Sequence, residues 1–207
     1  MRISDLSRQT GMSTATIKFY IREGLLPPGR LTARNQAVYS ECHLRRLQLI
    51  RALTTVGGLG LASVRTLLEA IADDDLPLAE LYAIVNRTIC AHDPVIDEIV
   101  AEEPVREDVD RFFETLGWDP DSPARQHIVA MMGTLRSLGG ADGMDFFLPH
   151  ARAAAELAEQ EMDLLPSDGM KTDRAAAVLR AVLFGEVLSS LRRLAQEHQA
   201  AQRFRAA

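Results

Sequence analysis

The sequence predicts a mainly α-helical fold that begins with a winged helix-turn-helix and ends in an all-helical region. Two observations support this fold class. Apolar residues recur at helical spacing along most of the 207 residues, and only residues 31–39 depart from that period. Gly11, Gly24 and Pro27 interrupt the first apolar segments, so the chain is expected to begin with two short helices.

The N-terminal segment has the start and stop signals of a helix-turn-helix. Ser4 is expected to cap a first helix that Gly11 ends in the left-handed conformation. Ser13 is expected to cap a second helix, which Gly24 closes. Two helices of about two or three turns joined by a glycine-containing turn form this motif. Residues 31–39 then fit a short hairpin, or β wing.

The rest of the chain is expected to be helical. Ser40 caps a third helix, a fourth follows Gly57-Gly58, and Asp73-Asp74-Asp75 marks a boundary before further helices. The last helix is expected to begin near Thr172 or Asp173. The predicted parts are a DNA-binding domain at 1–72, a linker or dimerisation helix region at 73–101, and a helical effector-binding or dimerisation domain at 102–207.

The charges separate a basic N-terminal part from an acidic remainder. The whole chain has a formal net charge of −6. Residues 1–70 contain ten Lys and Arg against four Asp and Glu, so they carry +6 and leave −12 for the remainder. This asymmetry favours a nucleic-acid-binding module attached to an acidic body. The alternative is a chance cluster of charges on a solvated face.

Composition and motifs argue against several other classes of protein. No apolar run approaches the roughly 20 residues that span a bilayer, and the polar N-terminus predicts no secretion signal. Cys42 and Cys90 suggest no disulfide framework, so a cytoplasmic, nucleoid-associated protein is expected. No nucleophile–base pair, phosphate loop or paired carboxylates occur at useful spacing. The sequence therefore predicts neither an enzyme nor a bound cofactor.

The second expected helix has two chemically different faces. Thr14, Lys18 and Arg22 recur every four residues and share one face, whereas Ile17 and Ile21 share another. The apolar face can pack on the first helix. The polar face offers a hydroxyl, an ammonium and a guanidinium group, which are groups that contact bases and phosphates in a major groove. A basic helix face is also common on solvated surfaces, so this helix does not decide the function alone.

The neighbouring residues support a family resemblance. The stretch 16–26, TIKFYIREGLL, resembles the recognition helix and exit of MerR-type regulators, which usually read TIRYYExxGLL. The resemblance continues through Val38-Tyr39-Ser40, Leu44-Arg45-Arg46-Leu47 and the segment 57–68. It implies a winged helix-turn-helix, a homodimer held by an antiparallel helix pair, and operator DNA in an overlong promoter spacer. RNA polymerase at the promoter is a further partner, and no membrane partner is expected.

By position, the resemblance implies DNA contacts along the second helix and the wing. Lys18, Phe19 and Tyr20 occupy the family's Arg-Tyr-Tyr site, and Arg34 lies in the first wing. The family's Gly-Tyr-Arg of the wing aligns with Asn35-Gln36-Ala37, so two wing contacts are missing and the recognition helix is expected to carry more of the binding. The predicted DNA-binding residues are Ser13, Thr14, Thr16, Lys18, Phe19, Tyr20, Arg22, Arg30, Arg34, Asn35 and Tyr39.

Aromatic and sulfur side chains concentrate in the acidic part of the chain. They fit the core of a helical bundle, and they also fit an adaptable pocket for a small hydrophobic effector. Glu186 lies within an apolar stripe of the last helix, where a buried carboxylate needs a partner, either an arginine of the protein or a cationic ligand. The candidate effector-pocket residues are Phe112, Phe113, Trp118, Met131, Phe146, Phe147 and Glu186.

Two further features leave alternatives open. Cys90, His92 and Asp93 offer three metal ligands, but residues at i and i+2 of a helix point apart, so no metal site is predicted. Dimerisation has two candidate elements: residues 76–101, which Pro94 interrupts, and the long C-terminal helix. The apolar residues of that helix are Leu179, Val182, Leu183, Val187, Leu191 and Leu194.

Together these features predict a dimeric, sequence-specific DNA-binding transcriptional regulator that controls a promoter in response to an effector. Two other functions remain as alternatives. One is a protein that sequesters a small molecule and regulates its own gene through DNA binding. The other is an architectural DNA-binding protein, for which the large acidic domain has no evident purpose.

Overall fold

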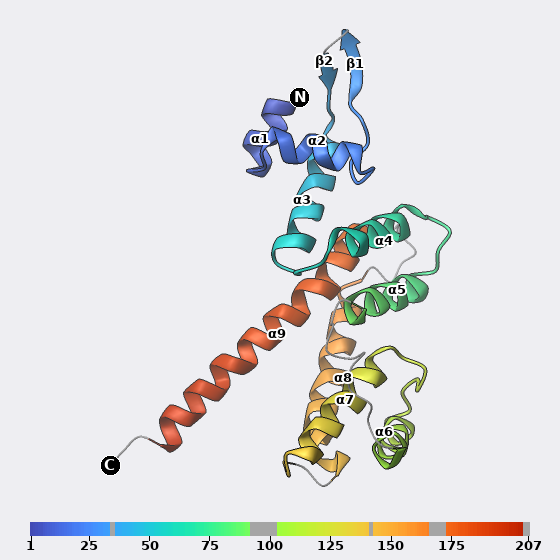
Figure 1. Ribbon diagram of the computed structural model, residues 1–207, viewed down its shortest axis with the longest axis vertical. Helices are drawn as coiled ribbons and strands as arrows, with labels where there is room; N and C mark the ends of the chain where they lie inside the picture. Colours follow the sequence, from blue (N-terminus) through green and yellow to red (C-terminus); the bar gives the residue numbers. More distant parts are fainter. Residues whose placement is uncertain (34–35, 92–102, 141–142, 166–172, 205–207) are drawn as a thin grey trace. The chain divides into compact units, whose positions relative to one another are not determined.

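The computed structural model describes residues 1–33, 36–91, 103–140, 143–165 and 173–204. These residues form α-helices, one 3-10 helix and a two-stranded sheet (Figure 1). The mainly helical class, with an N-terminal helix-turn-helix and a two-stranded wing, is confirmed. The chain divides into two compact units, which we call the N-terminal unit (Met1–Pro77 with Val178–Ala207) and the middle unit (Leu78–Ala177). No described helix is long and apolar enough to cross a membrane.

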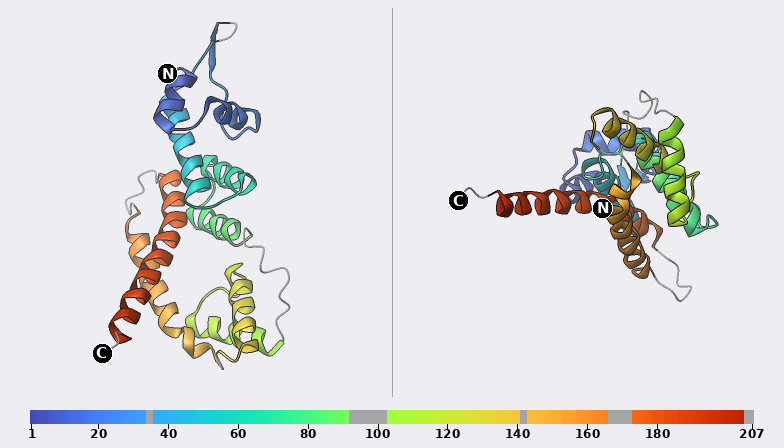
Figure 2. Two further views of the ribbon diagram at one scale, coloured as in Figure 1. Left: turned by 60° about the vertical axis from the view of Figure 1, so that its left-hand side comes forward. Right: turned by 90° about the horizontal axis from the view of Figure 1, so that it is seen from below.

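The N-terminal unit contains the helix-turn-helix, the wing, two further helices and most of the last helix (Figures 1 and 2). Its elements are α1 (Ile3–Thr10), α2 (Thr14–Arg22), β1 (Arg30–Ala33), β2 (Gln36–Val38), α3 (Glu41–Thr55), α4 (Leu61–Ala72) and, from Val178 onward, α9 (Arg174–Arg203).

The turn between α1 and α2 has the predicted chemistry. Gly11 ends α1 with φ of 69°, a conformation that costs a residue with a Cβ atom about 1–2 kcal/mol. Ser13 caps α2, because its Oγ accepts a hydrogen bond from the Thr16 backbone N–H at 3.0 Å. The predicted cap of α1 is wrong, since the N-cap residue is Arg2 and Ser4 lies inside the first turn. Asp5 explains the earlier start by accepting the Arg2 backbone N–H at 2.8 Å.

The wing is an antiparallel hairpin, in which Arg30 pairs with Val38 and Leu31 with Ala37. Its base is tied to the N-terminus of the chain. The Met1 amine donates to the Tyr39 carbonyl at 2.9 Å, and the Tyr39 backbone N–H donates to the Met1 carbonyl at 2.8 Å. These hydrogen bonds fix where the wing leaves the helix-turn-helix.

An aliphatic core joins α1, α2, α3 and α4. The spacing of apolar residues predicts that Leu44, Leu47 and Ile50 of α3 face inward, and all three are buried. Of the stripe predicted for α4, Val64, Leu67 and Leu68 are buried and Ile71 is half-buried. Fully burying one such side chain contributes about 1.5–3 kcal/mol. The largest fully buried side chains of these helices and their connections are Leu6, Ile17, Leu25, Leu26, Leu47, Ile50, Leu53, Val64, Leu67 and Leu68.

The beginning of α9 packs into the N-terminal unit. Val182 is buried, and its Cγ1 lies only 2.6 Å from the position that a Cβ atom on Gly57 would take. The missing side chain of Gly57 therefore allows this approach. The sequence groups α9 with the rest of residues 102–207, whereas the contacts place it from Val178 onward with residues 1–77.

The middle unit is all helical. Its elements are α5 (Leu78–Cys90), α6 (Glu103–Leu116), α7 (Ala124–Ser137), the 3-10 helix η1 (Met144–Phe147) and α8 (Leu148–Asp163). A small core lies between α6, α7 and η1. The core side chains are Val105, Val109, Phe113, Val129, Met132 and Met144.

The spacing of apolar residues predicts one inward face of α7, and the structure buries a different one. The residues predicted to face inward are Ile128, Met131, Met132, Leu135 and Leu138. Val129 and Met132 are buried, whereas Met131 is 54% exposed and Leu138 is exposed. Apolar residues occur on more than one side of this helix, and its contacts with α5 and α6 decide which side is covered. A single-helix pattern does not contain that information.

Candidate nucleic-acid interface

The polar face predicted for α2 is present, because Thr14, Lys18 and Arg22 are exposed on one side. On the other side Ile17 is buried as predicted, together with Tyr20, whereas Ile21 is only half-buried. The helix is therefore anchored by its apolar side. The exposed side presents a hydroxyl and two cationic groups, which suits phosphate and base-edge contacts in a major groove.

The exposed guanidinium of Arg22 has local partners. Its Cζ atom lies 5.3 Å from the centroid of the Phe19 ring, and its Nε lies 3.6 Å from Glu23 Oε1. Arg65 Nη2 approaches the other Glu23 oxygen at 4.0 Å. Exposed pairs of this kind contribute little stability, about 0–1 kcal/mol. Their effect is to limit the positions that the Arg22 side chain occupies at the end of α2.

Ser13 and Thr16 belong to the N-terminal cap of α2. Their hydroxyl oxygens lie 2.8 Å apart, and Ser13 Oγ also accepts the Thr16 backbone N–H. The cap satisfies one of the free N–H groups at the start of the helix. The structure thus gives both residues a structural role next to the exposed face, whether or not they also contact DNA.

The two tyrosines among the predicted contact residues lie in the core. Tyr20 is 8% exposed and Tyr39 is 7% exposed. Tyr20 follows Ile17 by three residues, so it shares the buried side of α2. The Tyr39 ring packs edge-on against His43, with 5.3 Å between the centroids. Packing occupies most of the surface of Tyr20, and its contact with DNA stays a prediction.

The wing contributes one described cation. Arg30 is exposed at the start of β1, in the first pair of the hairpin. Arg34 and Asn35, the other predicted wing contacts, lie outside the described residues. Phe19 is half-buried beside Tyr20, with ring centroids 5.8 Å apart.

Two arginines of α3, neither of which is among the predicted residues, donate hydrogen bonds to backbone carbonyls of the helix-turn-helix. Arg51 Nη1 donates to the Thr10 carbonyl at the end of α1. Arg46 Nε donates to the Leu25 carbonyl at 2.6 Å, just after α2, and burial lowers the pKa of Arg46. Each satisfies a carbonyl at a helix exit. The only signal in the sequence is that Arg46 directly precedes the buried Leu47.

Sequence comparisons agree on the N-terminal segment. The family model described as MerR HTH family regulatory protein matches residues 1–71. The HTH-type transcriptional regulator ZntR homolog of Haemophilus influenzae is 40% identical over 50 residues, which are 24% of this chain and 37% of that protein. The HTH-type transcriptional regulator CueR of Salmonella typhimurium is 35% identical over 57 residues, 28% of this chain and 41% of that protein. The match thus spans about two fifths of these relatives.

A solved structure extends the likeness to the whole chain. SCO5550 of Streptomyces coelicolor A3(2), which is named as a transcriptional regulator, is 34% identical, with a TM-score of 0.66. The alignment covers 100% of this chain and 99% of that one. The chain belongs to the MerR family. MerR-family proteins are DNA-binding transcription regulators and not enzymes, so the exposed face of α2 lies in a DNA-binding domain.

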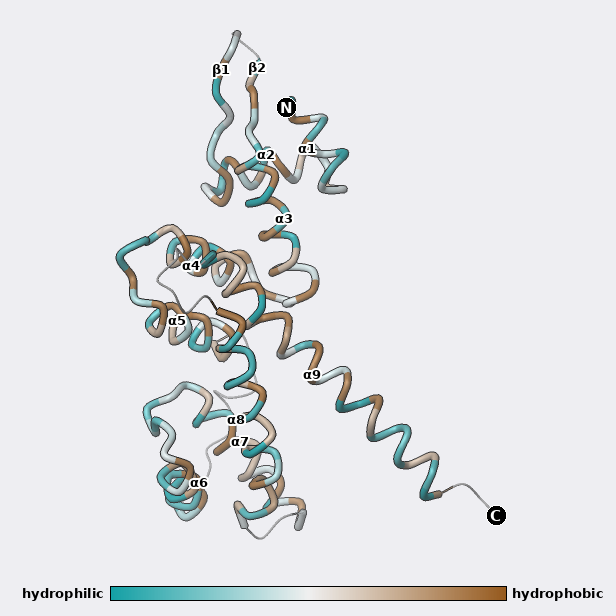
Figure 3. Tube along the Cα trace, turned by 180° about the vertical axis from the view of Figure 1, so that it is seen from behind, coloured by the Kyte–Doolittle hydropathy of each residue, from teal (hydrophilic) through white to brown (hydrophobic). Residues whose placement is uncertain are grey.

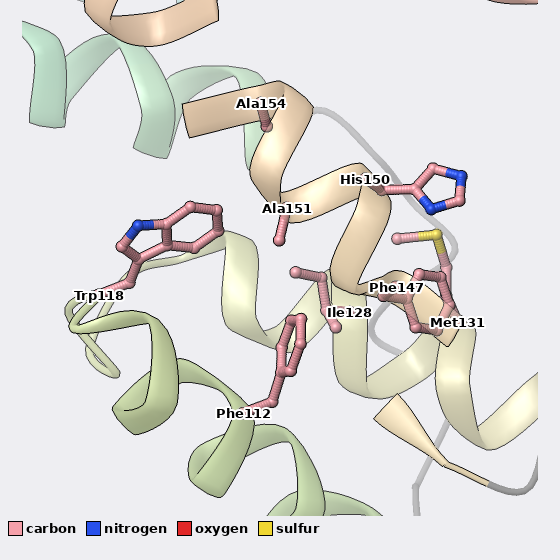
Figure 4. A pocket seen from close by; sticks show the side chains of 8 residues that line it. All are labelled: Phe112, Trp118, Ile128, Met131, Phe147, His150, Ala151 and Ala154. Atoms are coloured by element: carbon pink, nitrogen blue, oxygen red, sulfur yellow. The ribbon is translucent and has the colours of Figure 1, made fainter. Parts of the chain in front are cut away.

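The middle unit of this MerR-family chain contains an apolar pocket of about 210 Å³ (Figure 4). Four of the predicted effector-pocket residues line it: Phe112, Trp118, Met131 and Phe147. The sequence analysis missed the other four lining residues: Ile128, His150, Ala151 and Ala154. The two alanines supply no aromatic or sulfur signal in the sequence, although their small side chains leave the space open.

Three predicted pocket residues lie elsewhere. Phe113 is buried in the core of the middle unit, and Phe146 is 63% exposed and does not line the pocket. Glu186 is exposed on α9, which corrects the expectation of a buried carboxylate in need of a partner. The reason is that α9 is exposed at every described residue from Gly185 onward.

Two ion pairs join α6 to α7, which both contribute to the pocket. Arg125 pairs with Asp110, with Nη2 donating to Oδ2 at 2.7 Å, and Arg136 pairs with Asp108. The hydrogen bond from Arg136 lowers the pKa of Asp108, and that from Arg125 lowers the pKa of Asp110. The pairs therefore favour one relative placement of the two helices.

The described residues contain no group of three or more His, Cys, Asp or Glu side chains that could hold a metal ion. His92 and Asp93 lie outside the described residues, so the structure does not test a metal site at Cys90. Cys90 Sγ lies 3.6 Å from Asn86 Oδ1, one turn earlier on α5.

Proposed function

We propose that the protein acts as a dimer that binds operator DNA, with α2 of each protomer in one major-groove half-site. The observation that carries this proposal is the exposed row of Thr14, Lys18 and Arg22 on a helix whose other side is buried. Lys18 and Arg22 suit phosphates or guanine edges, and Thr14 suits either a phosphate or a base. Arg30 on the wing suits the flanking DNA backbone.

The second half of α9 is the element that we assign to dimerisation. Val187, Leu188, Leu191 and Leu194 are all exposed and form a stripe along this part of the helix. Figure 3 shows hydrophobic turns recurring along α9 beyond the point where it leaves the other helices of its unit. Most of the stability of a helix in a protein comes from packing its apolar face, and a second copy offers the same stripe in return.

A dimer also fits the geometry of DNA recognition. Two copies related by a two-fold axis present two α2 helices to a palindromic operator, with half-sites separated by a whole number of helical turns. An effector bound in the middle unit then favours one dimer geometry over another. The change in twist or bend imposed on the promoter would be the regulatory output.

The experiment that tests the DNA interface removes its two cations. Lys18→Ala with Arg22→Ala is expected to lower operator affinity by at least about a hundredfold, because two charged contacts of about 1.5–3 kcal/mol each are lost. The operator is first obtained by selection from random DNA with the wild-type protein, and affinity is then measured by gel shift.

The matched control removes two exposed arginines of the middle unit, Arg111→Ala with Arg152→Ala. Both double variants lower the net charge by the same amount. Full operator affinity in the Lys18/Arg22 variant, or an equal loss in the control, would refute the recognition-helix assignment. A wild-type protein whose operator binding does not change when it binds a small molecule would instead favour sequestration.

A further inference from the structure

The side chains that line the middle-unit pocket are apolar except for His150. Phe112, Ile128 and Ala151 approach one another at its centre, Trp118 lies on one side, and Met131 and Phe147 lie on the other (Figure 4). These side chains come from α6, α7, η1 and α8 and from the turn after α6. A cavity formed by several separate elements around alanines is a pre-formed space rather than a gap along one helix.

The charge of a suitable ligand follows from the lining. No Asp, Glu, Lys or Arg belongs to the described residues that line this pocket. Nearby Asp108 and Asp110 are already paired with Arg136 and Arg125. An ionised ligand would lose its water without gaining a counter-ion, which is strongly unfavourable. The pocket therefore suits an uncharged molecule.

The size of a suitable ligand follows from the volume. An apolar cavity of about 150 Å³ holds one benzene molecule. The present pocket, at about 210 Å³, has room for one substituted ring or two fused rings. Aromatic walls and the Met131 thioether favour a ring over an aliphatic chain of equal size, since they add edge-to-face and sulfur–aromatic contacts.

One polar side chain stands at the rim. The His150 ring is exposed and lies 6.1 Å, between centroids, from the rings of both Phe146 and Phe147. Its ring nitrogens provide a hydrogen-bond partner for a hydroxyl, carbonyl or ring N–H of the ligand. Trp118 and Met131 are also partly exposed, so a bound ligand would cover apolar surface that now contacts water.

We infer that this pocket is the effector site of the middle unit and that it binds an uncharged aromatic molecule of one or two rings. The regulatory meaning of the site rests on the proposed function, but binding itself does not. The pocket is lined by middle-unit residues alone, and ligand binding is measurable without DNA.

Trp118 makes the test direct, because it is the only tryptophan of the chain and it lines the pocket. Three probes share one ring and differ in charge: propylbenzene, phenylpropionate and phenylpropylamine. Tryptophan emission is followed in the full-length protein, excited where these single rings do not absorb. Propylbenzene is expected to shift the emission saturably and to bind at least about tenfold more tightly than either charged probe, which corresponds to about 1.4 kcal/mol.

Adjacent alanines of α8 provide matched variants. Ala153 and Ala154 are both exposed, but only Ala154 lines the pocket. Ala154→Leu is expected to weaken propylbenzene binding at least about tenfold by filling the space, and Ala153→Leu is expected to leave it unchanged. Both positions are on the helix surface, and circular dichroism checks that both variants remain folded.

Several results would overturn the inference. They are an emission that does not respond to propylbenzene, equal affinity for a charged probe, full affinity in Ala154→Leu, or an equal loss in Ala153→Leu. Operator binding by the same samples is measured separately by gel shift. A protein that binds DNA but not propylbenzene would refute only the ligand class, and one that binds propylbenzene but not DNA would refute only the proposed function.

Discussion

The helix-turn-helix and the middle unit are both helical, yet they differ in how their surfaces are determined. In α2, one apolar side and one polar side follow from the spacing of residues within nine positions. In α7, the covered side depends on contacts with α5 and α6, and Met131 stays exposed at a position that the pattern assigns to the core. Local pattern therefore sets the DNA-facing surface, whereas tertiary packing sets the pocket.

This contrast predicts that a destabilising substitution in the core of one unit leaves the other unit folded and active. Leu47 is fully buried in α3, and Met132 is fully buried in α7. Each substitution to alanine is expected to cost about 2–5 kcal/mol of unfolding free energy. Leu47→Ala should abolish operator binding while Trp118 emission stays close to that of the wild type, and Met132→Ala should do the reverse.

Gel shift and tryptophan emission, each followed during urea denaturation, measure the two effects in the same samples. A loss of both signals in both variants would mean that the units unfold as one cooperative block. The two units would then unfold together, although their surfaces are determined in different ways.

Alanine substitution of either of two glycines with the same backbone conformation is expected to have a smaller effect on stability. Gly11 and Gly139 have φ of 69° and 70°. A Cβ atom on Gly139 meets nothing within 4 Å, whereas one on Gly11 lies 2.8 Å from Arg51 Nη1. Both alanine variants pay the left-handed penalty of about 1–2 kcal/mol, and Gly11→Ala also displaces the guanidinium that donates to Thr10.

Gly11→Ala is therefore expected to be the more destabilising of the two and to weaken operator binding, with no change in binding by Gly139→Ala. Denaturant midpoints and gel shifts provide the comparison. If both variants lose the same stability, Arg51 is a replaceable surface contact. If both retain operator affinity, the Arg51–Thr10 hydrogen bond does not position α2.

The limits of sequence-based prediction follow the same division. Gly11, Ser13 and the stripe of α3 were assigned correctly because each signal acts within a few residues. The family motif places Tyr20 among the predicted DNA contacts, whereas its spacing from Ile17 places it on the buried side of α2. The apolar stripe around Glu186 predicts a buried carboxylate, but a stripe does not reveal whether the same chain covers it, and Glu186 is exposed.

Half of the residues that line the pocket could be predicted from the sequence. Large aromatic and sulfur-containing residues mark where an apolar site can form, and four of those predicted line it: Phe112, Trp118, Phe147 and Met131. Ala151 and Ala154 create its space by their small size, and alanine is common on any helix. Arg46 and Arg51 were missed because a carbonyl at a distant helix exit is visible only in three dimensions.

The smallest expected effect concerns the ion pairs that join α6 and α7. Because arginine hydrogen bonds lower the pKa values of Asp108 and Asp110 in the folded state, both pairs contribute their full stability above the ordinary carboxyl pKa of about 3.9. That contribution is lost as the pH falls through the lowered values. The Asp108 and Asp110 side chains are 31% and 40% exposed, so each pair is expected to contribute less than about 1 kcal/mol.

Thermal melting followed by Trp118 emission isolates this effect in the middle unit. The wild type should lose melting temperature on acidification below about pH 4, and Asp108→Asn with Asp110→Asn should show a flatter profile and a lower value at neutral pH. Operator binding at neutral pH should stay unchanged in the double variant, because α2 depends on its own local pattern and on the core of the N-terminal unit. An altered operator affinity would mean that the α6–α7 placement reaches the DNA-binding surface, which is the coupling that an effector in the pocket would use.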